Sequence, residues 1–248
     1  MTRLEAAQAT LRRLHDSRRT EEAYLYWIRE FIRFHHKQHP RTMGAREITA
    51  FLNDLATQRR VSASTQNQAL CAIVFLYKRV LDMAMPELSG LEPARRPMHL
   101  PAVLSRREVL ALLDKLDTPF RLMGEIFYGA GLRLMECVSL RVKDVDLDRH
   151  QVMVRRGKGN RDRAALLPVR ARESLRAQLE HVAARNRMEL AKGRGEVDLP
   201  HALRAKMPGA ATSLARQYLF PASRPCIDAA TGRLVLHHIH ETGVQKAI

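Results

Sequence analysis

The chain of 248 residues exceeds a typical single domain, and its 46% hydrophobic content predicts two compact units and excludes a disordered protein. Its 42 Lys and Arg against 26 Asp and Glu give a net charge of +16. The surplus is shared, because residues 1–97 hold 16 basic and 10 acidic residues and residues 98–248 hold 26 and 16. We therefore expect both parts to face a polyanion, with nucleic acid favoured over a membrane surface.

The cysteines and the apolar runs indicate the compartment. Cys71, Cys137 and Cys226 lie far apart without metal-ligand spacing, which argues against a zinc ribbon or a disulfide framework. The longest apolar run, residues 69–77, is too short to span a bilayer, and the start of the chain lacks the apolar stretch of a signal peptide. The cytoplasm is the expected location, with no membrane partner.

Helical periodicity dominates the first part of the chain. Thr20, followed by two glutamates, is predicted to cap a long amphipathic helix, and Thr65 with Gln68 is predicted to form a capping box. The predicted helices cover residues 4–14, 20–39, 47–58 and 65–81. They predict a four-helix bundle as the first domain, residues 1–85, followed by a proline-punctuated linker over residues 86–101.

The second part, residues 102–248, mixes helices with a small β-hairpin. Ser105 and Glu108 form a full capping box, a second helix runs over residues 119–128, and Gly129 to Gly131 break the chain before a helix that starts near Arg133. Alternating apolar residues predict a hairpin with strands near 151–154 and 164–167 and an unusually basic turn. Helices are expected over residues 172–190 and after His240. The fold class is thus mainly α with a small β-sheet.

Arg133 and Glu136 form the first candidate site. A glycine-led helix start presents unsatisfied backbone N–H groups, and an Arg there can donate two hydrogen bonds to phosphate oxygens while keeping its charge. Glu136, one turn later, is placed to orient the Arg133 guanidinium. Taken alone, such a pair is more commonly a surface salt bridge at i,i+3 spacing.

The hairpin turn is the second candidate. Lys158 at its tip is placed to supply a proton or a charge to a leaving oxygen, and Arg156 and Arg161 flank it. The alternative is an ordinary Gly- and Asn-containing turn with solvated basic residues. A nucleotide-binding P-loop is disfavoured because no Ser or Thr follows the Gly-Lys pair.

The order of these segments resembles that of the integron integrases, a branch of the tyrosine recombinases. The resemblance covers the whole chain. It is carried by RTEEAY at 19–24 with WIR at 27–29, VSASTQNQAL at 61–70 with FLY at 75–77, GLRLME at 131–136, and GKGN at 157–160 with Arg163. It extends to Leu199-Pro200 with Ala202-Leu203, Gln217 with Phe220-Pro221, and His237-His238, which lie around the extra helix typical of integron integrases.

The resemblance implies a helical core-binding (SAM-like) domain and an α/β catalytic domain, with an integron-type insert at about 191–217, that close around DNA. It implies that Arg133 holds the scissile phosphate, Lys158 protonates the leaving 5′ oxygen and Glu136 supports them, without a metal or other cofactor. The implied DNA contacts are Arg156, Arg161, Arg163, Arg216, His237 and His238. The implied partners are duplex attachment sites, folded single-stranded cassette sites and further copies of the full-length protein on DNA.

The chain also departs from the family pattern. Integron integrases carry a His-x-x-Arg motif, a later His or Trp and a nucleophilic Tyr, and we expect the catalytic domain to be truncated before them. Tyr128 and Tyr218 lie in the wrong context, so no nucleophile is assigned. Where family members tend to carry base-stacking aromatics, residues 213–216 read Ser-Leu-Ala-Arg. A metal site at His237, His238 and His240 is disfavoured because no Cys or acid lies at ligand spacing.

Two hypotheses follow from the sequence. The chain is part of a recombinase, or it is a catalytically inactive DNA-binding remnant of an integrase. An unrelated transcriptional regulator is disfavoured because no helix-turn-helix pattern is evident.

Overall fold

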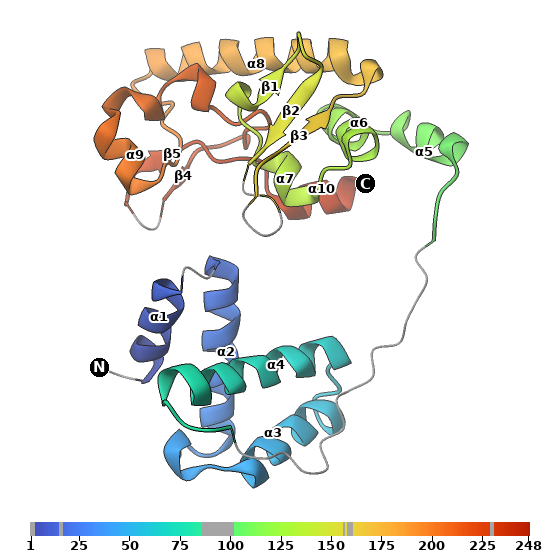
Figure 1. Cartoon of the computed structure of the whole chain (residues 1–248). Coiled ribbons are helices and arrows are strands. Elements are labelled where there is room, and N and C mark those ends of the chain that lie inside the picture. The colour runs from blue at the N-terminus through green and yellow to red at the C-terminus, as the bar shows by residue number, and fades with distance from the viewer. Residues whose placement is uncertain (1–2, 15–16, 86–101, 156, 158–160, 229–230) are drawn as a thin grey trace. The chain divides into compact units, whose positions relative to one another are not determined.

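The computed structural model describes residues 3–14, 17–85, 102–155, 157, 161–228 and 231–248. The chain divides into two compact units, residues 1–101 and 102–248 (Figure 1). The predicted linker over residues 86–101 lies outside the described residues. The fold class expected from the sequence is confirmed, because the described elements are mostly helical with small antiparallel sheets.

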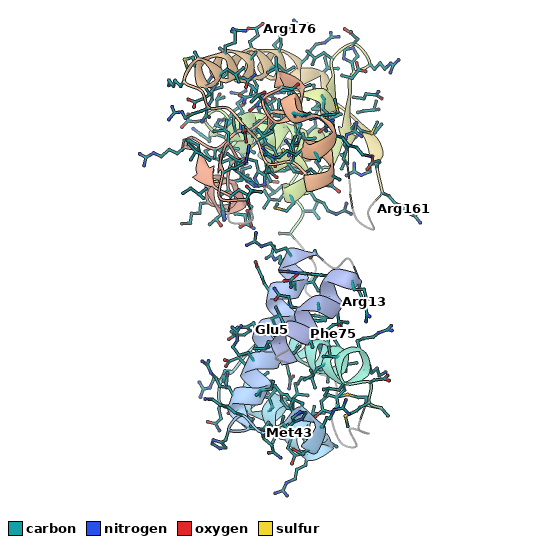
Figure 2. All side chains as sticks on the ribbon, turned by 90° about the vertical axis from the view of Figure 1, so that its left-hand side faces the viewer. Glu5, Arg13, Met43, Phe75, Arg161 and Arg176 are labelled. Atoms are coloured by element: carbon teal, nitrogen blue, oxygen red, sulfur yellow. The ribbon has the colours of Figure 1, made fainter. Side chains whose placement is uncertain are left out.

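Unit 1 is a helical bundle with one apolar core. Its elements are α1 (Arg3–Arg13), α2 (Arg18–Phe34), the 3-10 turn η1 (Pro40–Thr42), α3 (Ala45–Thr57), α4 (Ala63–Phe75) and the π-helical turn η2 (Leu76–Val80). Large side chains at helical spacing, such as Phe31, Phe51 and Ile73, are fully buried. Figure 2 marks Met43 and Phe75, two further core residues. Burial of each such side chain contributes about 1.5–3 kcal/mol.

Three predicted helix boundaries in unit 1 are wrong. Ser17, and not Thr20, caps α2, because the Ser17 hydroxyl accepts the backbone N–H of Thr20 at 3.2 Å. Ser62 caps α4 in the same way, accepting the Thr65 N–H at 3.2 Å. The Gln68 side chain instead accepts a hydrogen bond from Trp27 Nε1 at 3.3 Å.

The third wrong boundary is the end of α2. The helix ends at Phe34, before the expected His39-Pro40, because His36 and Lys37 adopt positive φ angles of 51° and 65°. The Lys37 N–H donates to the Ile32 carbonyl at 2.8 Å, which satisfies a carbonyl of the last helical turn.

Unit 2 surrounds a small antiparallel sheet with helices. The strands β1 (Val145–Asp146), β2 (Gln151–Val154) and β3 (Arg163–Leu166) are ordered β1-β2-β3, with Val152 opposite Ala165 and Val154 opposite Arg163. The helices that precede the sheet are α5 (Arg106–Leu113), α6 (Phe120–Ala130) and α7 (Leu134–Val138), followed by the 3-10 turn η3 (Val142–Asp144). The predicted capping box of α5 is present, and β1 is a strand that the sequence pattern did not predict.

The rest of unit 2 follows the sheet in the chain. After the 3-10 turn η4 (Val169–Ala171) come α8 (Arg172–Ala191), α9 (His201–Lys206), the 3-10 turns η5 (Pro208–Ala211) and η6 (Leu214–Arg216), the strands β4 (Cys226–Ile227) and β5 (Leu234–Val235), and α10 (Glu241–Ala247). Figure 1 shows α10 beside α7, and residues of the two helices contact each other. In the described part of the chain, no helix is long and apolar enough to cross a membrane.

Candidate functional site

Arg133 is placed at the entry to α7 by a sharp change in chain direction. Gly131, with φ of 62°, ends α6, and its N–H donates to the Phe127 carbonyl at 3.1 Å. Glycine tolerates this left-handed conformation without a Cβ clash. Arg133 then occupies the N-cap position of α7, where its backbone N–H donates to Glu136 Oε2 at 2.9 Å.

The Glu136 carboxylate joins two arginines from different elements. Arg133 Nη1 donates to Oε1 at 2.8 Å, and Arg163 Nη2, from β3, donates to Oε2 at 2.7 Å. The Glu136 side chain is only 7% exposed, whereas Arg133 is 58% exposed. Burial alone would raise the pKa of Glu136, but the backbone and guanidinium of Arg133 and the charge of Arg163 outweigh it and lower that pKa. The ionised carboxylate thus fixes two guanidiniums while Arg133 stays accessible.

The hairpin loop begins against this carboxylate. A Cβ on Gly157 would lie 3.2 Å from Glu136 Oε1 and 3.1 Å from the Arg161 carbonyl oxygen, so only glycine fits there without displacement. The Gly157 N–H donates to that Arg161 carbonyl at 3.0 Å and closes the loop. The side chain of Arg161 is exposed and projects from the hairpin end of unit 2 (Figure 2).

Two expected site residues of the hairpin are not described. Arg156 and Lys158 lie outside the described residues, so their roles stay predictions. What the structure brings together is Arg133, Glu136, Arg163 and the start of the loop at Gly157.

A second network ties the segment after α8 to the chain before β1. Arg141 Nη1 donates to the Arg216 carbonyl at 2.6 Å, and Nη2 donates to the Asp198 carbonyl at 3.1 Å and to the Tyr218 hydroxyl at 2.9 Å. The Tyr218 hydroxyl donates to Asp198 Oδ1 at 2.6 Å. The backbone of Arg141 also forms a bridge with Tyr218. Arg141 therefore contacts both ends of the segment that contains α9.

The Tyr218 hydroxyl is hydrogen-bonded on both sides within this network. Burial is the main cause that raises the pKa of its hydroxyl well above the ordinary value, and Asp198 adds to the effect while Arg141 opposes it. A buried hydroxyl with two hydrogen-bond partners and a raised pKa is a poor nucleophile. Tyr128, on α6, is exposed.

His237 and His238, expected to contact DNA, pack beside Tyr218 in the structure. Their ring centres lie 5.4 and 5.2 Å from the Tyr218 ring centre. Burial lowers the pKa of His238, and its Nδ1 lies 2.7 Å from the Ile239 carbonyl oxygen, so this nitrogen is the donor. His240 instead caps α10. Among the described residues, no group of three His, Cys, Asp or Glu side chains could hold a metal ion.

A cleft of about 460 Å³ lies between the two networks. Glu136 lines one side of it, and Arg141 and Tyr218 line the other. Between them stands the buried Asp144, whose Oδ1 accepts from Arg155 Nε at 2.7 Å and whose Oδ2 accepts from the Arg141 backbone N–H at 3.0 Å. The cleft also contains Lys143 and Arg216.

Four residues of this cleft were not predicted from the sequence, namely Arg141, Lys143, Asp144 and Arg155. A local signal for one pair was available, because Asp144 follows Arg141 at the same i,i+3 spacing that joins Arg133 to Glu136. In both pairs the carboxylate accepts the backbone N–H of the arginine. The partners contributed by Asp198 and Tyr218 are distant in sequence and left no such signal.

Unit 1 has a polar groove of its own. It measures about 530 Å³ and lies where α2 and α4 begin, lined by Ser17, Arg19, Thr20, Asn67 and Gln68 among others. Backbone N–H groups at helix starts favour anions, and Arg19 adds a charge of the same sign.

Comparisons with known families match both units. Residues 4–87 match the family model described as phage integrase, N-terminal SAM-like domain. Residues 102–217 match the model described as phage integrase family.

Individual relatives agree with the family models. An integrase/recombinase of Escherichia coli and one of Pseudomonas aeruginosa are each 41% identical to this chain over 244 residues, which cover 98% of this chain and 72% of theirs. Two solved structures share the fold. The Tn1549 transposon integrase in complex with transposon right end DNA has a TM-score of 0.56 at 12% identity, covering 90% of this chain and 72% of that one. A lambda integrase tetramer bound to a Holliday junction has a TM-score of 0.56 at 17% identity, covering 72% and 53%.

Proposed function

Because this chain belongs to the phage integrase family of tyrosine recombinases, we propose that it is a site-specific DNA recombinase of the integron-integrase type. Its partner is duplex DNA, and the scissile phosphate binds at Arg133. The observation that carries this assignment is the buried Glu136 carboxylate, which holds Arg133 and Arg163 at 2.8 and 2.7 Å and adjoins the start of the hairpin loop at Gly157.

The chemistry follows from these groups. The Arg133 guanidinium donates to non-bridging oxygens of the phosphate and stabilises the charge that grows on them. Lys158, which the sequence predicts at the hairpin turn, gives its proton to the 5′ oxygen as a tyrosine oxygen displaces that oxygen from the phosphate. The phosphotyrosyl bond stores the energy of the cut strand, so rejoining requires no nucleotide hydrolysis. None of the five tyrosines in this sequence is assigned that role.

Both units contribute to DNA binding in this proposal. The net charge of +16 is divided between them, and unit 1 adds the polar groove that contains Arg19. Fluorescence anisotropy with a labelled duplex should show an affinity that falls steeply with salt, by about 0.9 in log K per unit of log salt for each neutralised phosphate. A nearly flat plot would contradict DNA binding by charge neutralisation.

The integron type is supported by the segment over residues 192–217, which contains α9 and is held by Arg141. A folded single-stranded hairpin with extrahelical bases tests it against a duplex of the same length. We expect the chain to bind this hairpin at least as tightly as the duplex. Binding of the duplex alone would leave the family assignment in place and contradict the integron type.

The second candidate function is DNA binding without catalysis. We propose that a polypeptide of residues 1–248 binds DNA but does not cleave it. The Tyr218 hydroxyl is already hydrogen-bonded to Arg141 and Asp198, and Tyr128 lies on α6, outside the Arg133 cluster. Incubation with a nicked, end-labelled attachment site, followed by a denaturing gel, reveals any covalent adduct. We expect none. An adduct that disappears in Tyr128→Phe or Tyr218→Phe would identify the nucleophile and overturn this proposal.

A further inference from the structure

Two cations share the cleft between Glu136 and Tyr218 without a carboxylate of their own. Lys143 lies in η3 and Arg216 lies in η6, and both line the same 460 Å³ hollow. Within the part of the chain that the structure describes, no ion pair links the Lys143 Nζ or the Arg216 guanidinium to an acidic group.

The acids of the cleft are already engaged elsewhere. Glu136 holds Arg133 and Arg163, and Asp144 holds the Arg155 side chain and the Arg141 backbone. Asp198 accepts the Tyr218 hydroxyl and lies 3.6 Å from Arg141 Nη2. These bonds leave Lys143 and Arg216, which line the same cleft, without an acidic partner among the described residues.

The two cations repel each other in the unliganded protein. Partial burial is the largest cause that lowers the pKa of Lys143, and the charge of Arg216 is the next; Asp144 opposes them, and Arg155 and Arg141 make smaller contributions that lower it. Cations held close together without counter-charges cost stability. An anion in the cleft would remove this repulsion, and a phosphate group is well matched to an ammonium and a forked guanidinium.

We propose that Lys143 and Arg216 bind a second backbone phosphate of the DNA whose scissile phosphate is held at Arg133. The two positions adjoin, because Glu136 contacts Arg133 and also lines the cleft. Arg216 belongs to the segment after α8, so this segment contacts DNA through a charge as well as through any base-stacking surface. The inference rests on the proposed function and adds a defined phosphate position to it.

The test uses the full chain, a fluorescein-labelled duplex and the variants Lys143→Gln and Arg216→Gln. Each variant should weaken binding roughly tenfold at low salt, and each should reduce the slope of log K against log salt by about 0.9. Because both side chains bind one phosphate, the double variant should lose little more than either single variant, which is the mark of coupled residues. Lys115→Gln and Arg176→Gln, which remove exposed charges outside the cleft, serve as matched controls.

Thermal stability separates a binding role from a structural one. Removing one of two repelling cations should leave the melting temperature of the free protein unchanged or raised, whereas loss of a structural contact would lower it. Weakened binding together with unchanged or raised stability supports the proposal. DNA affinity equal to that of the control variants overturns it. A loss of affinity accompanied by a lowered melting temperature also overturns it.

Free phosphate carries the same charged oxygens as the DNA backbone, so its binding to the cleft is tested separately. Inorganic phosphate, added at matched ionic strength, should stabilise the wild type only weakly, because a single phosphate lacks the neighbouring contacts of a strand. If it stabilises the wild type but not the variants, while the variants bind DNA normally, then the cleft is a site for a small phosphorylated molecule and the strand assignment is wrong. If the wild type itself does not bind DNA, the proposed function fails, whatever the variants do.

Discussion

Replacement of Glu136 by Gln removes one charge from the centre of the Arg133 cluster and keeps the shape of the side chain. The backbone N–H of Arg133, which donates to Oε2 at 2.9 Å, can still donate to the amide oxygen. With that oxygen at the Oε2 position, Arg163 donates to a neutral acceptor in place of its 2.7 Å bond to the carboxylate, and the 2.8 Å hydrogen bond from Arg133 Nη1 to Oε1 is lost. At least one guanidinium then faces an amide NH₂ group, with which it cannot form a hydrogen bond.

The expected loss of stability follows from burial. A hydrogen bond to a charged group contributes about 1.5–3 kcal/mol, and the Glu136 side chain is only 7% exposed, so the loss of one such bond and the weakening of a second would be costly without solvation. Arg133 and Arg163 are 58% and 38% exposed, however, so water solvates the freed guanidiniums and reduces the cost. We expect a loss of about 2 kcal/mol, which lowers the melting temperature of a unit of this size by about 4–8 °C.

Differential scanning calorimetry at neutral and acidic pH measures this loss. Since the pKa of Glu136 is lowered in the folded protein, its carboxylate stabilises the fold fully above the ordinary value of 4.5, and this stabilisation disappears as the pH falls through the lowered value. The gap between wild type and Glu136→Gln should therefore close in acid. Glu173→Gln, which removes an exposed partner of Arg176, is the control. A gap at neutral pH no larger than that of Glu173→Gln, or a gap that persists in acid, would refute the reasoning.

Three further predictions concern other contacts of unit 2. Arg133→Ala should weaken duplex binding about tenfold or more and shift the melting temperature less than Glu136→Gln does, because Glu136 keeps Arg163; a large loss of stability with normal DNA binding would contradict the phosphate role. Arg141→Ala should accelerate proteolysis within residues 192–217, since Asp198, Arg216 and Tyr218 lose their common donor, and an unchanged cleavage rate would show that Arg141 does not hold this segment. Gly129→Ala should cost about 1–3 kcal/mol in urea unfolding, because the new Cβ would lie 2.6 Å from the rigid ring of Pro168, whereas Gly209→Ala meets nothing within 4 Å and should be nearly neutral.

Local patterns predicted the elements of the fold well. Apolar residues at helical spacing indicated α2 and α3, and the alternating valines of residues 151–154 with the apolar run of residues 164–167 indicated the β2–β3 hairpin, because these patterns depend on which face is buried. The spacing of Arg133 and Glu136 likewise predicted their ion pair. Helix starts were predicted less well. Ser17 and Thr20 both suit an N-cap, and only the folded backbone decides which hydroxyl reaches a free N–H.

The network around Arg141 could not be read from the sequence. Its bonds join residues 57, 75 and 77 positions apart, and no periodicity connects them. A basic residue in a basic chain also gives no sign of whether it faces solvent, an acid or a ligand. Arg155 is paired with Asp144, whereas Lys143 nearby is not, and the difference depends on tertiary packing alone.

The hydrogen bonds from Arg141 to the Asp198 and Arg216 carbonyls affect how the length of the segment between these two residues can vary. Since both ends are fixed at one guanidinium, the intervening residues form a closed loop whose entropy of closure grows only with the logarithm of its length, by about 0.6 kcal/mol for each doubling. The closure term for a longer segment is therefore small, but Ala210 and Ala211 of η5 are buried, and the Ala211 carbonyl accepts the Val197 N–H at 2.9 Å. A segment exchanged between relatives must therefore keep these two small residues as well as Arg141, Asp198 and Tyr218.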